Sequence, residues 1–336
     1  MLTINIILVN DDRRDFMKKR ISYVCILTTA LVFSLMEIVL KLASNQVTGL
    51  NGIQISFWRF VIAVACFLPF MMRQIKRQKI SFTGKDWRNF ILLGFVFVVC
   101  CMSMYQISCK LEPAAIAAII FSCNPVFVLL FSKLILHKRL TGIEKGTLFF
   151  ALIGMVLVVS PHELLSQLNN WQGILISISG SALFGLYTVL SKRYLNENPG
   201  ANGFIISGMS FLCGLVELWI VIGLTHISVI SNFFKAIPSL QMFSNVPMIR
   251  NLTPANIGVL LFIGIVITAV GYGCYFYAVE NAGSFPASSS FFIKSILAPI
   301  LATIILHEQM KLTVIIGIIL VIIGLALPFV FKKKEA

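Results

Sequence analysis

Charged residues are scarce in this sequence. Only 12% of its 336 residues are charged, whereas 58% are hydrophobic and the mean hydropathy is +0.93. Soluble domains carry about 25% charged residues. This scarcity excludes a soluble globular fold and indicates a protein embedded in a lipid bilayer.

Motifs that carry chemistry are also missing. The eight cysteines include no C-x-x-C pair and no pairing with histidine at metal spacing, so we expect neither a metal site nor a cofactor. No G-x-x-x-x-G-K-[ST] motif occurs, which argues against nucleotide-driven pumping. The stretch HEQMK (307–311) lacks the second histidine of a zinc-protease motif. The apolar segments hold no nucleophile with a base, so we do not expect an enzyme.

Long apolar runs fill most of the chain. A helix rises 1.5 Å per residue, so about 20 apolar residues cross a hydrocarbon core of about 30 Å. We predict ten transmembrane helices, at residues 21–43, 52–72, 87–109, 113–136, 146–160, 171–191, 201–225, 254–278, 285–306 and 312–331.

The net charge of +14 follows from 27 lysine and arginine residues. Most of them lie on alternate connections between the predicted helices: before residue 21, within 73–88, 138–145 and 192–193, and after residue 331. The remaining connections hold Lys110, Lys235, Arg250 and Lys311. This bias is the positive-inside rule with both termini in the cytoplasm. It explains the basic character of the chain without a nucleic-acid partner.

Parts of the sequence occur twice. With an offset of 151, VFSLMEIVLK (32–41) aligns with LFGLYTVLSK (183–192), and Glu37 stands opposite Thr188. An offset of 170 pairs Tyr105 with Tyr275, Phe121 with Phe291, and Gly154 with Gly324. Each half holds five predicted helices, an odd number, so the second half must enter the membrane in the opposite sense. Inverted repeats of this kind are typical of secondary transporters.

The duplication predicts an all-α polytopic membrane protein with ten transmembrane helices in two inverted five-helix repeats. Its parts are a cytoplasmic N-terminal segment (1–20), the first repeat (21–160), the second repeat (171–331) and a basic cytoplasmic tail (332–336). In the N-terminal segment the apolar part precedes the charges, so we do not expect a signal peptide. Met17 is an alternative start.

Three stretches carry a family resemblance. NPVFVLLFSKLILHKRLTGIEKG (124–146), GILISISGSALFGLYTVLSKRYL (173–195) and FFIKSILAPILATIILHEQMK (291–311) are similar to the EamA-like branch of the drug/metabolite transporter superfamily. The resemblance covers residues 21–331. It implies a central cavity lined by helices one to four and six to nine, with helices five and ten at the side. Lys138 and Ser295 replace the Glu and Pro of the family pattern, so the family's coupling mechanism does not transfer directly.

Four charged residues share a depth in the outer half of the predicted bundle: Glu37, Lys41, Arg59 and Glu217. Glu37 is roughly 9 Å and Arg59 roughly 10 Å from the outer ends of their helices. A lone charge in lipid costs at least about 2.5–3.5 kcal/mol. These residues could form a structural salt-bridge cluster, or take part in gating or substrate contact. Arg59 is the preferred partner of Glu37, and Lys41 is the alternative.

Lys294 lies near the middle of the ninth predicted helix, and the sequence places no acidic residue at its depth. Its counterpart in the first repeat is Asn124. Pro125 and Pro299 remove helical hydrogen bonds, so we expect the carbonyls of Phe121 and Ser295 to be unpaired and to line a cavity.

We predict a substrate site formed by Lys294, Asn124, Ser290, Tyr105, Tyr187 and Tyr275. The tyrosines offer apolar faces and hydroxyl groups. A lysine at the centre suits a ligand with an anionic group, although a solvated, snorkelling lysine and tyrosines that only pack are the alternatives.

The residues favour a secondary transporter, an exporter or exchanger, that moves a small polar metabolite such as an amino acid or organic anion by alternating access. The alternatives are a multidrug or cation efflux carrier and a non-transporting receptor or scaffold on the same fold. We expect a multi-pass protein of the cell (plasma or inner) membrane whose partners are a small-molecule substrate and the lipid bilayer. A homodimer is left open.

The predicted topology places both termini in the cytoplasm and the connection at 226–253 outside. Reporter fusions after Lys85 and after Lys235 are therefore expected to localise to opposite sides of the membrane. The same side for both would end the argument for inverted repeats.

Overall fold

The computed structural model describes residues 17–36, 39, 50–111, 120–159, 171–307 and 312–331. Within these residues every regular element is a helix, and helices overlap all ten predicted spans. Seven helices are long and apolar enough to cross a membrane: Met17–Met36, Gly52–Gln78, Gly84–Cys109, Trp171–Glu197, Gly203–Leu224, Pro254–Asn281 and Ser284–Ile305. Ile120–Ile135 and Leu312–Leu327 are shorter apolar helices. The predicted all-helical membrane class is confirmed.

The described residues of the first half of the chain form five helical segments. They are the helix Met17–Met36; α2 (Gly52–Gln78); a continuous run of α3 (Gly84–Gly94), η1 (Phe95–Cys101) and α4 (Met102–Leu111); α6 (Asn124–Ile135); and α7 (Gly142–Val159). The second half repeats this order. Its segments are α9 (Trp171–Glu197); α10 (Gly203–Leu224); α12 (Pro254–Phe262) with η4 (Ile263–Val270) and α13 (Gly271–Asn281); α14 (Ser284–Ser288) with α15 (Ser290–Leu306); and α16 (Leu312–Phe331).

The two halves also begin their helices in the same way. The Asn51 side chain caps α2 and the Asn202 side chain caps α10, at an offset of 151. Thr83 caps α3 and Thr253 caps α12, at an offset of 170. Each side-chain oxygen accepts a hydrogen bond from a backbone N–H that the first helical turn leaves unpaired. The repeat therefore extends to the polar residues that set the helix starts.

A π-helical segment is duplicated as well. η1 lies within the third helix of the first half, and η4 lies within the corresponding helix of the second half. Their positions overlap at the offset of 170. π-helical turns are rare, and they occur frequently at functional sites. Nothing in the apolar sequence of either segment indicated them.

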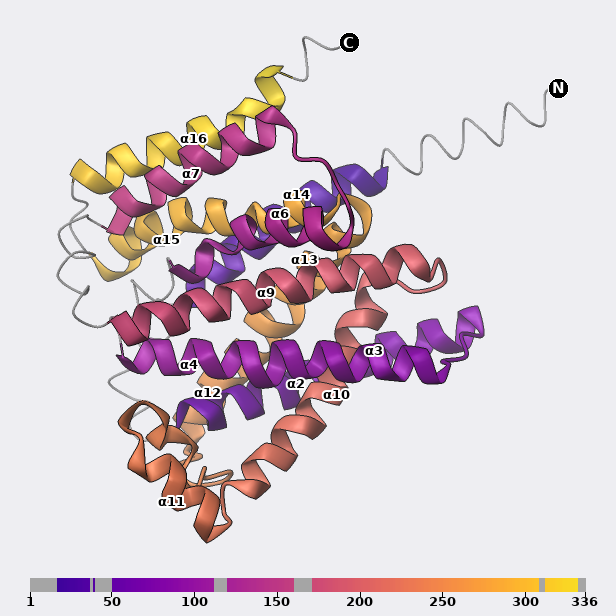
Figure 1. Cartoon of the computed structure of the whole chain (residues 1–336), viewed down its shortest axis with the longest axis vertical. Coiled ribbons are helices and arrows are strands. Elements are labelled where there is room, and N and C mark those ends of the chain that lie inside the picture. Colours follow the sequence, from indigo (N-terminus) through magenta and orange to yellow (C-terminus); the bar gives the residue numbers. More distant parts are fainter. Residues whose placement is uncertain are drawn as a thin grey trace.

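Helices α7 and α16 lie side by side along one edge of the bundle (Figure 1). A Cβ atom added to Gly154 would lie 2.6 Å from the Gly317 oxygen and 2.9 Å from the Val321 nitrogen, and one added to Gly324 would lie 3.0 Å from the Thr147 oxygen. At an offset of 170, Gly154 corresponds to Gly324 and Thr147 to Gly317, so the two contacts are reciprocal. Thr147 lies against Gly324, and Gly154 lies against Gly317. Residue numbers therefore rise along α7 while they fall along α16, so the two helices are antiparallel. A two-fold axis perpendicular to both helices therefore relates the repeats.

The connection between α10 and α12 breaks this symmetry. It contains α11 (Ser228–Ala236) and η3 (Pro238–Phe243) and has no counterpart of that length between α2 and α3. Side chains near the start of α2 bind its backbone: Asn51 Nδ2 donates to the Met242 carbonyl at 2.7 Å, and Trp58 Nε1 donates to the Met248 carbonyl at 2.7 Å. This insertion accounts for the change of offset from 151 to 170.

The glycine contact between α7 and α16 predicts the effect of a single methyl group. Gly154→Ala should lower the free energy of unfolding by about 1–3 kcal/mol, because the added Cβ meets backbone atoms that cannot move aside. Denaturant unfolding of the purified protein measures the change. Gly223→Ala is the matched control, since a Cβ there meets nothing within 4 Å, and its stability should be unchanged or higher. Equal stabilities of the two variants would contradict the contact.

Candidate functional site

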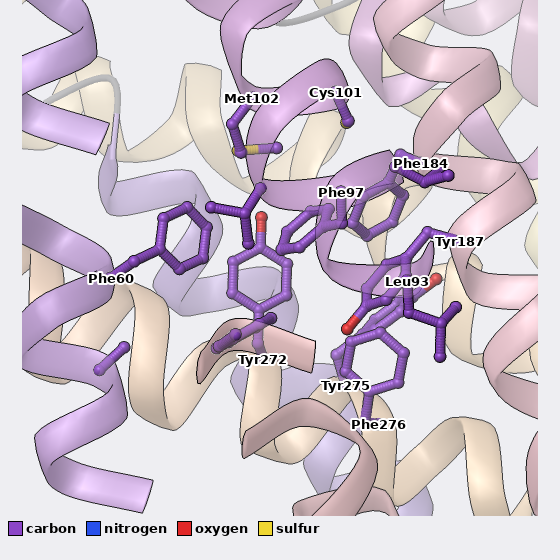
Figure 2. Close-up of a cluster of buried hydrophobic side chains, with 14 of the residues drawn as sticks. Phe60, Leu93, Phe97, Cys101, Met102, Phe184, Tyr187, Tyr272, Tyr275 and Phe276 are labelled. Carbon is purple, nitrogen blue, oxygen red and sulfur yellow. The ribbon is translucent and has the colours of Figure 1, made fainter. Parts of the chain in front are cut away.

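Aromatic side chains from both repeats fill the centre of the bundle (Figure 2). Phe97, on the π-helical η1, stacks on Tyr187 with ring centroids 4.5 Å apart and on Phe211 at 5.5 Å. Its ring also meets the Tyr272 ring edge-on at 5.1 Å. We call this group, with Phe33, Phe60, Phe121, Phe184, Tyr275 and Phe291, the central aromatic cluster. All of these side chains are buried.

The cluster lies on the two-fold axis. Phe60 and Phe211 are repeat counterparts, and their centroids are 5.1 Å apart; Phe121 and Phe291 are also counterparts, at 6.1 Å. The pair Phe33–Phe291 and its equivalent, Phe121–Phe184, both have centroids at 5.5 Å. A residue that contacts its own counterpart must lie beside the axis. In a membrane protein with inverted repeats this axis lies in the plane of the membrane, at the depth where substrates bind.

Two of the three predicted tyrosines, Tyr187 and Tyr275, belong to this cluster, and the third, Tyr105, packs against it. The Tyr187 hydroxyl lies 2.8 Å from Ser210 Oγ, and the Tyr275 hydroxyl lies 3.0 Å from Thr188 Oγ1. The Tyr105 ring packs on Phe121 with centroids 4.9 Å apart. The sequence therefore placed these tyrosines in one region, and the structure adds that Tyr187 and Tyr275 hydrogen-bond across helices.

The prolines do not leave every expected carbonyl unpaired. The Phe121 carbonyl accepts a hydrogen bond from Asn124 Nδ2 and another from Ser181 Oγ, both at 3.1 Å. The expectation of a free carbonyl there is wrong, because neighbouring side chains replace the missing helical donor. Asn124 Oδ1 and Ser290 Oγ are buried, and no described residue donates to them or accepts from them. These two atoms are polar groups that a ligand could engage.

Lys294 is buried, with 6% of its surface exposed. Its backbone carbonyl lies 3.4 Å from Ser34 Oγ on the first helix, and Phe291, one turn earlier, packs on Phe33. The sequence placed no acidic residue at the depth of Lys294, and in the structure this residue interacts with another group of the protein. Lys294 is therefore a buried residue next to the central aromatic cluster.

The predicted outer charge cluster is only partly described. Glu37 and Lys41 lie outside the described residues, so their pairing stays a prediction. Within the described part of the chain, no salt bridge joins Arg59 to Glu217. Glu217 lies near the thiols of Cys100 and Cys213, while Arg59 is directed at Met102.

Sequence reasoning missed several residues of the site. An offset of 151 aligns Phe60 with Phe211, and this match could have indicated a pair on the axis. Tyr272 aligns with Met102 at the offset of 170, which carries no such signal. Phe97 aligns with Ile267, so its central place follows from packing alone.

Comparison with known proteins places the chain in a family. The pattern of the EamA-like transporter family matches residues 20–160 and again residues 171–330. A transporter of Clostridium kluyveri, named only as uncharacterized, is 32% identical over 95% of both chains. This chain belongs to the EamA-like transporter family. It is a multi-pass membrane transporter.

Other proteins are similar to this chain at lower identity. The transporter YyaM of Bacillus subtilis is 24% identical over 80% of this chain and 81% of its own length. A riboflavin transporter of Brucella anthropi is 26% identical over 46% of this chain and 52% of its own length. A crystal structure covering 94% of this chain and 99% of its own superposes with a TM-score of 0.67 at 15% identity. That likeness shows the fold alone.

The bond between Thr188 and Tyr275 links α9 to α13, and its contribution can be measured. A double-mutant cycle of Thr188→Val and Tyr275→Phe should give a coupling energy of about 0.5–1.5 kcal/mol, the usual net value of a hydrogen bond. Unfolding in denaturant supplies the four free energies. Tyr23→Phe is the control, since that ring is 50% exposed, and its stability should not change. A coupling energy of zero would mean that the two hydroxyls do not bond.

Proposed function

We propose that this EamA-like transporter is a secondary transporter that exchanges or exports a small polar metabolite bearing an anionic group by alternating access. The observation that carries the proposal is the position of the central aromatic cluster on the two-fold axis between the repeats. Rings, hydroxyls and buried cations from both repeats converge there. Rocking one repeat against the other would then expose the same side chains to each side of the membrane in turn.

Contacts at one end of the bundle support such a cycle. Lys192 Nζ donates to the Glu280 carbonyl at 2.6 Å, and Glu280 Oε2 accepts from the Gly203 N–H at 2.6 Å. The Tyr194 hydroxyl donates to Asp86 at 2.8 Å. These bonds join the ends of α9, α10, α13 and α3. Under the predicted topology they close the cytoplasmic end, and the cycle requires them to break when the carrier opens inward.

Substrate class rests on the buried cations. Lys294 supports a substrate with a carboxylate or another anionic group, because an ammonium group buried in the membrane attracts an anion that can bind and leave again. The buried atoms Asn124 Oδ1 and Ser290 Oγ could hold the neutral polar groups of such a molecule. The riboflavin transporter among the relatives also supports a small organic cargo. An amino acid or related organic anion fits these features.

Lys294→Ala tests the proposal. The variant should insert into the membrane but lose at least about 90% of transport in proteoliposomes, since the substrate loses a charge contact worth more than about 1.4 kcal/mol. Asn124→Ala should be less severe. Lys133→Ala is the matched control, because Lys133 is exposed near the end of α6, and it should transport normally. Normal transport by the Lys294 variant, or recognition of bulky cations only, would contradict the assignment.

A further inference from the structure

Arg59 is the most deeply buried cation of the described residues, with 1% of its surface exposed. Its Nη2 lies 3.5 Å from the sulfur of Met102, a weak acceptor, and its Cζ lies 5.0 Å from the centre of the Phe60 ring. Nε and Nη1 are buried, and no described residue accepts a hydrogen bond from either atom. Buried donors are nearly always paired in native proteins, so this guanidinium requires an explanation.

The position of Arg59 is central rather than peripheral. Its neighbour Phe60 contacts its own repeat counterpart, Phe211. Met102 and Tyr272 are also counterparts, and Arg59 interacts with both. Figure 2 shows the Tyr272 ring between Phe60 and Phe97, with its hydroxyl directed toward Met102. Arg59 therefore lies beside the two-fold axis of the repeats.

The symmetry of the repeats is broken at this residue. The counterpart of Arg59 is Ser210, whose hydroxyl bonds Tyr187. The axis region thus receives one guanidinium group, from the first repeat alone. Arginine does not give up its charge in proteins, and among the described residues Arg59 faces a thioether sulfur and aromatic rings but no carboxylate, in a region of low polarity. An acceptor that arrives from outside the protein would remove the penalty while it is bound.

We infer that Arg59 binds the anionic group of the substrate and that the substrate is an organic carboxylate with a flat apolar body. This rests on the proposed function and names the residue that selects the cargo. A planar guanidinium matches the geometry of a carboxylate better than an ammonium group does. Phe60 lies beside Arg59, and its ring contacts Phe97 and Phe211, so aromatic side chains close to the guanidinium could accommodate the apolar body. Tyr272 contacts Phe33, which contacts Phe291, so the site continues toward Lys294.

The experiment compares the purified full chain with three variants in thermal unfolding, without and with added probes. The probes are benzoate and indole-3-acetate, and their neutral amides are matched analogues that keep the ring and lose the charge. Arg59→Met replaces the cation by an apolar side chain of similar length, and Arg59→Lys keeps the charge without the planar fork. Arg73→Met is the control, because Arg73 is exposed on the same helix.

We expect the carboxylates, but not the amides, to raise the apparent Tm of the wild type and of Arg73→Met. Arg59→Lys should weaken the apparent affinity by roughly tenfold or more, and Arg59→Met should abolish the effect. Without probe, Arg59→Met should unfold at the same or a higher temperature than the wild type, because it removes an uncompensated buried charge.

Three results would overturn the inference. A Tm of Arg59→Met several degrees below the wild type would show that Arg59 is half of a structural ion pair, for example with Glu37. Equal stabilisation by carboxylates and amides, or stabilisation that survives in Arg59→Met, would remove Arg59 from the binding site. Failure of both carboxylates to stabilise the wild type would refute the substrate class. The proposed function would still stand in each case if the reconstituted protein transports another small polar metabolite with an anionic group, and it fails if no such transport occurs.

Discussion

Two copies of one helical unit pack against each other in opposite senses, and this requirement governs the rest of the structure. Every contact near the two-fold axis must satisfy two surfaces that derive from the same pattern. Gly154 and Gly324 satisfy this requirement because they have no side chain, which allows the backbones of α7 and α16 to come into close contact. Phe60 and Phe211 satisfy the same requirement because their rings pack edge to face. Such self-complementary contacts resemble those of a symmetric dimer, here within one chain.

A bilayer has no water to bind unpaired backbone groups, so each interruption of a helix needs an internal partner. Asn124 and Ser181 supply donors to the Phe121 carbonyl where Pro125 cannot. The unequal connections between repeats are held in the same way, since Asn51 and Trp58 bind the backbone of the inserted segment. Polar side chains in this protein thus stabilise irregular backbone. The buried atoms without a hydrogen-bond partner among the described residues include Asn124 Oδ1, Ser290 Oγ and two nitrogens of Arg59, and we propose that these engage a ligand.

The proposed alternating-access cycle requires the two repeats to differ in conformation at any moment, although their sequences are related. In this structure Thr188 and Tyr275 bond in one half of the bundle, while Glu280 joins α13 to the start of α10 at the same end. The central rings are packed by contacts of modest strength, about 0.5–1.5 kcal/mol per aromatic pair beyond the area that they bury. Contacts with energies this small can break and re-form in a second conformation of the protein, because no single contact is strong enough to hold the protein in one conformation.

The sequence by itself determined the helical spans, the duplication and the family, because hydropathy and repetition are local properties of the chain. It also brought Tyr187, Tyr275, Asn124 and Lys294 to one region, because depth along a helix can be counted from its end. It did not determine which residues meet across helices. The partner of Lys294, the ring of Phe97 at the centre and the unpaired nitrogens of Arg59 depend on how each helix is rotated about its axis and on which neighbour it faces. Only the packing of both repeats around one axis decides these, since it brings together side chains more than a hundred residues apart.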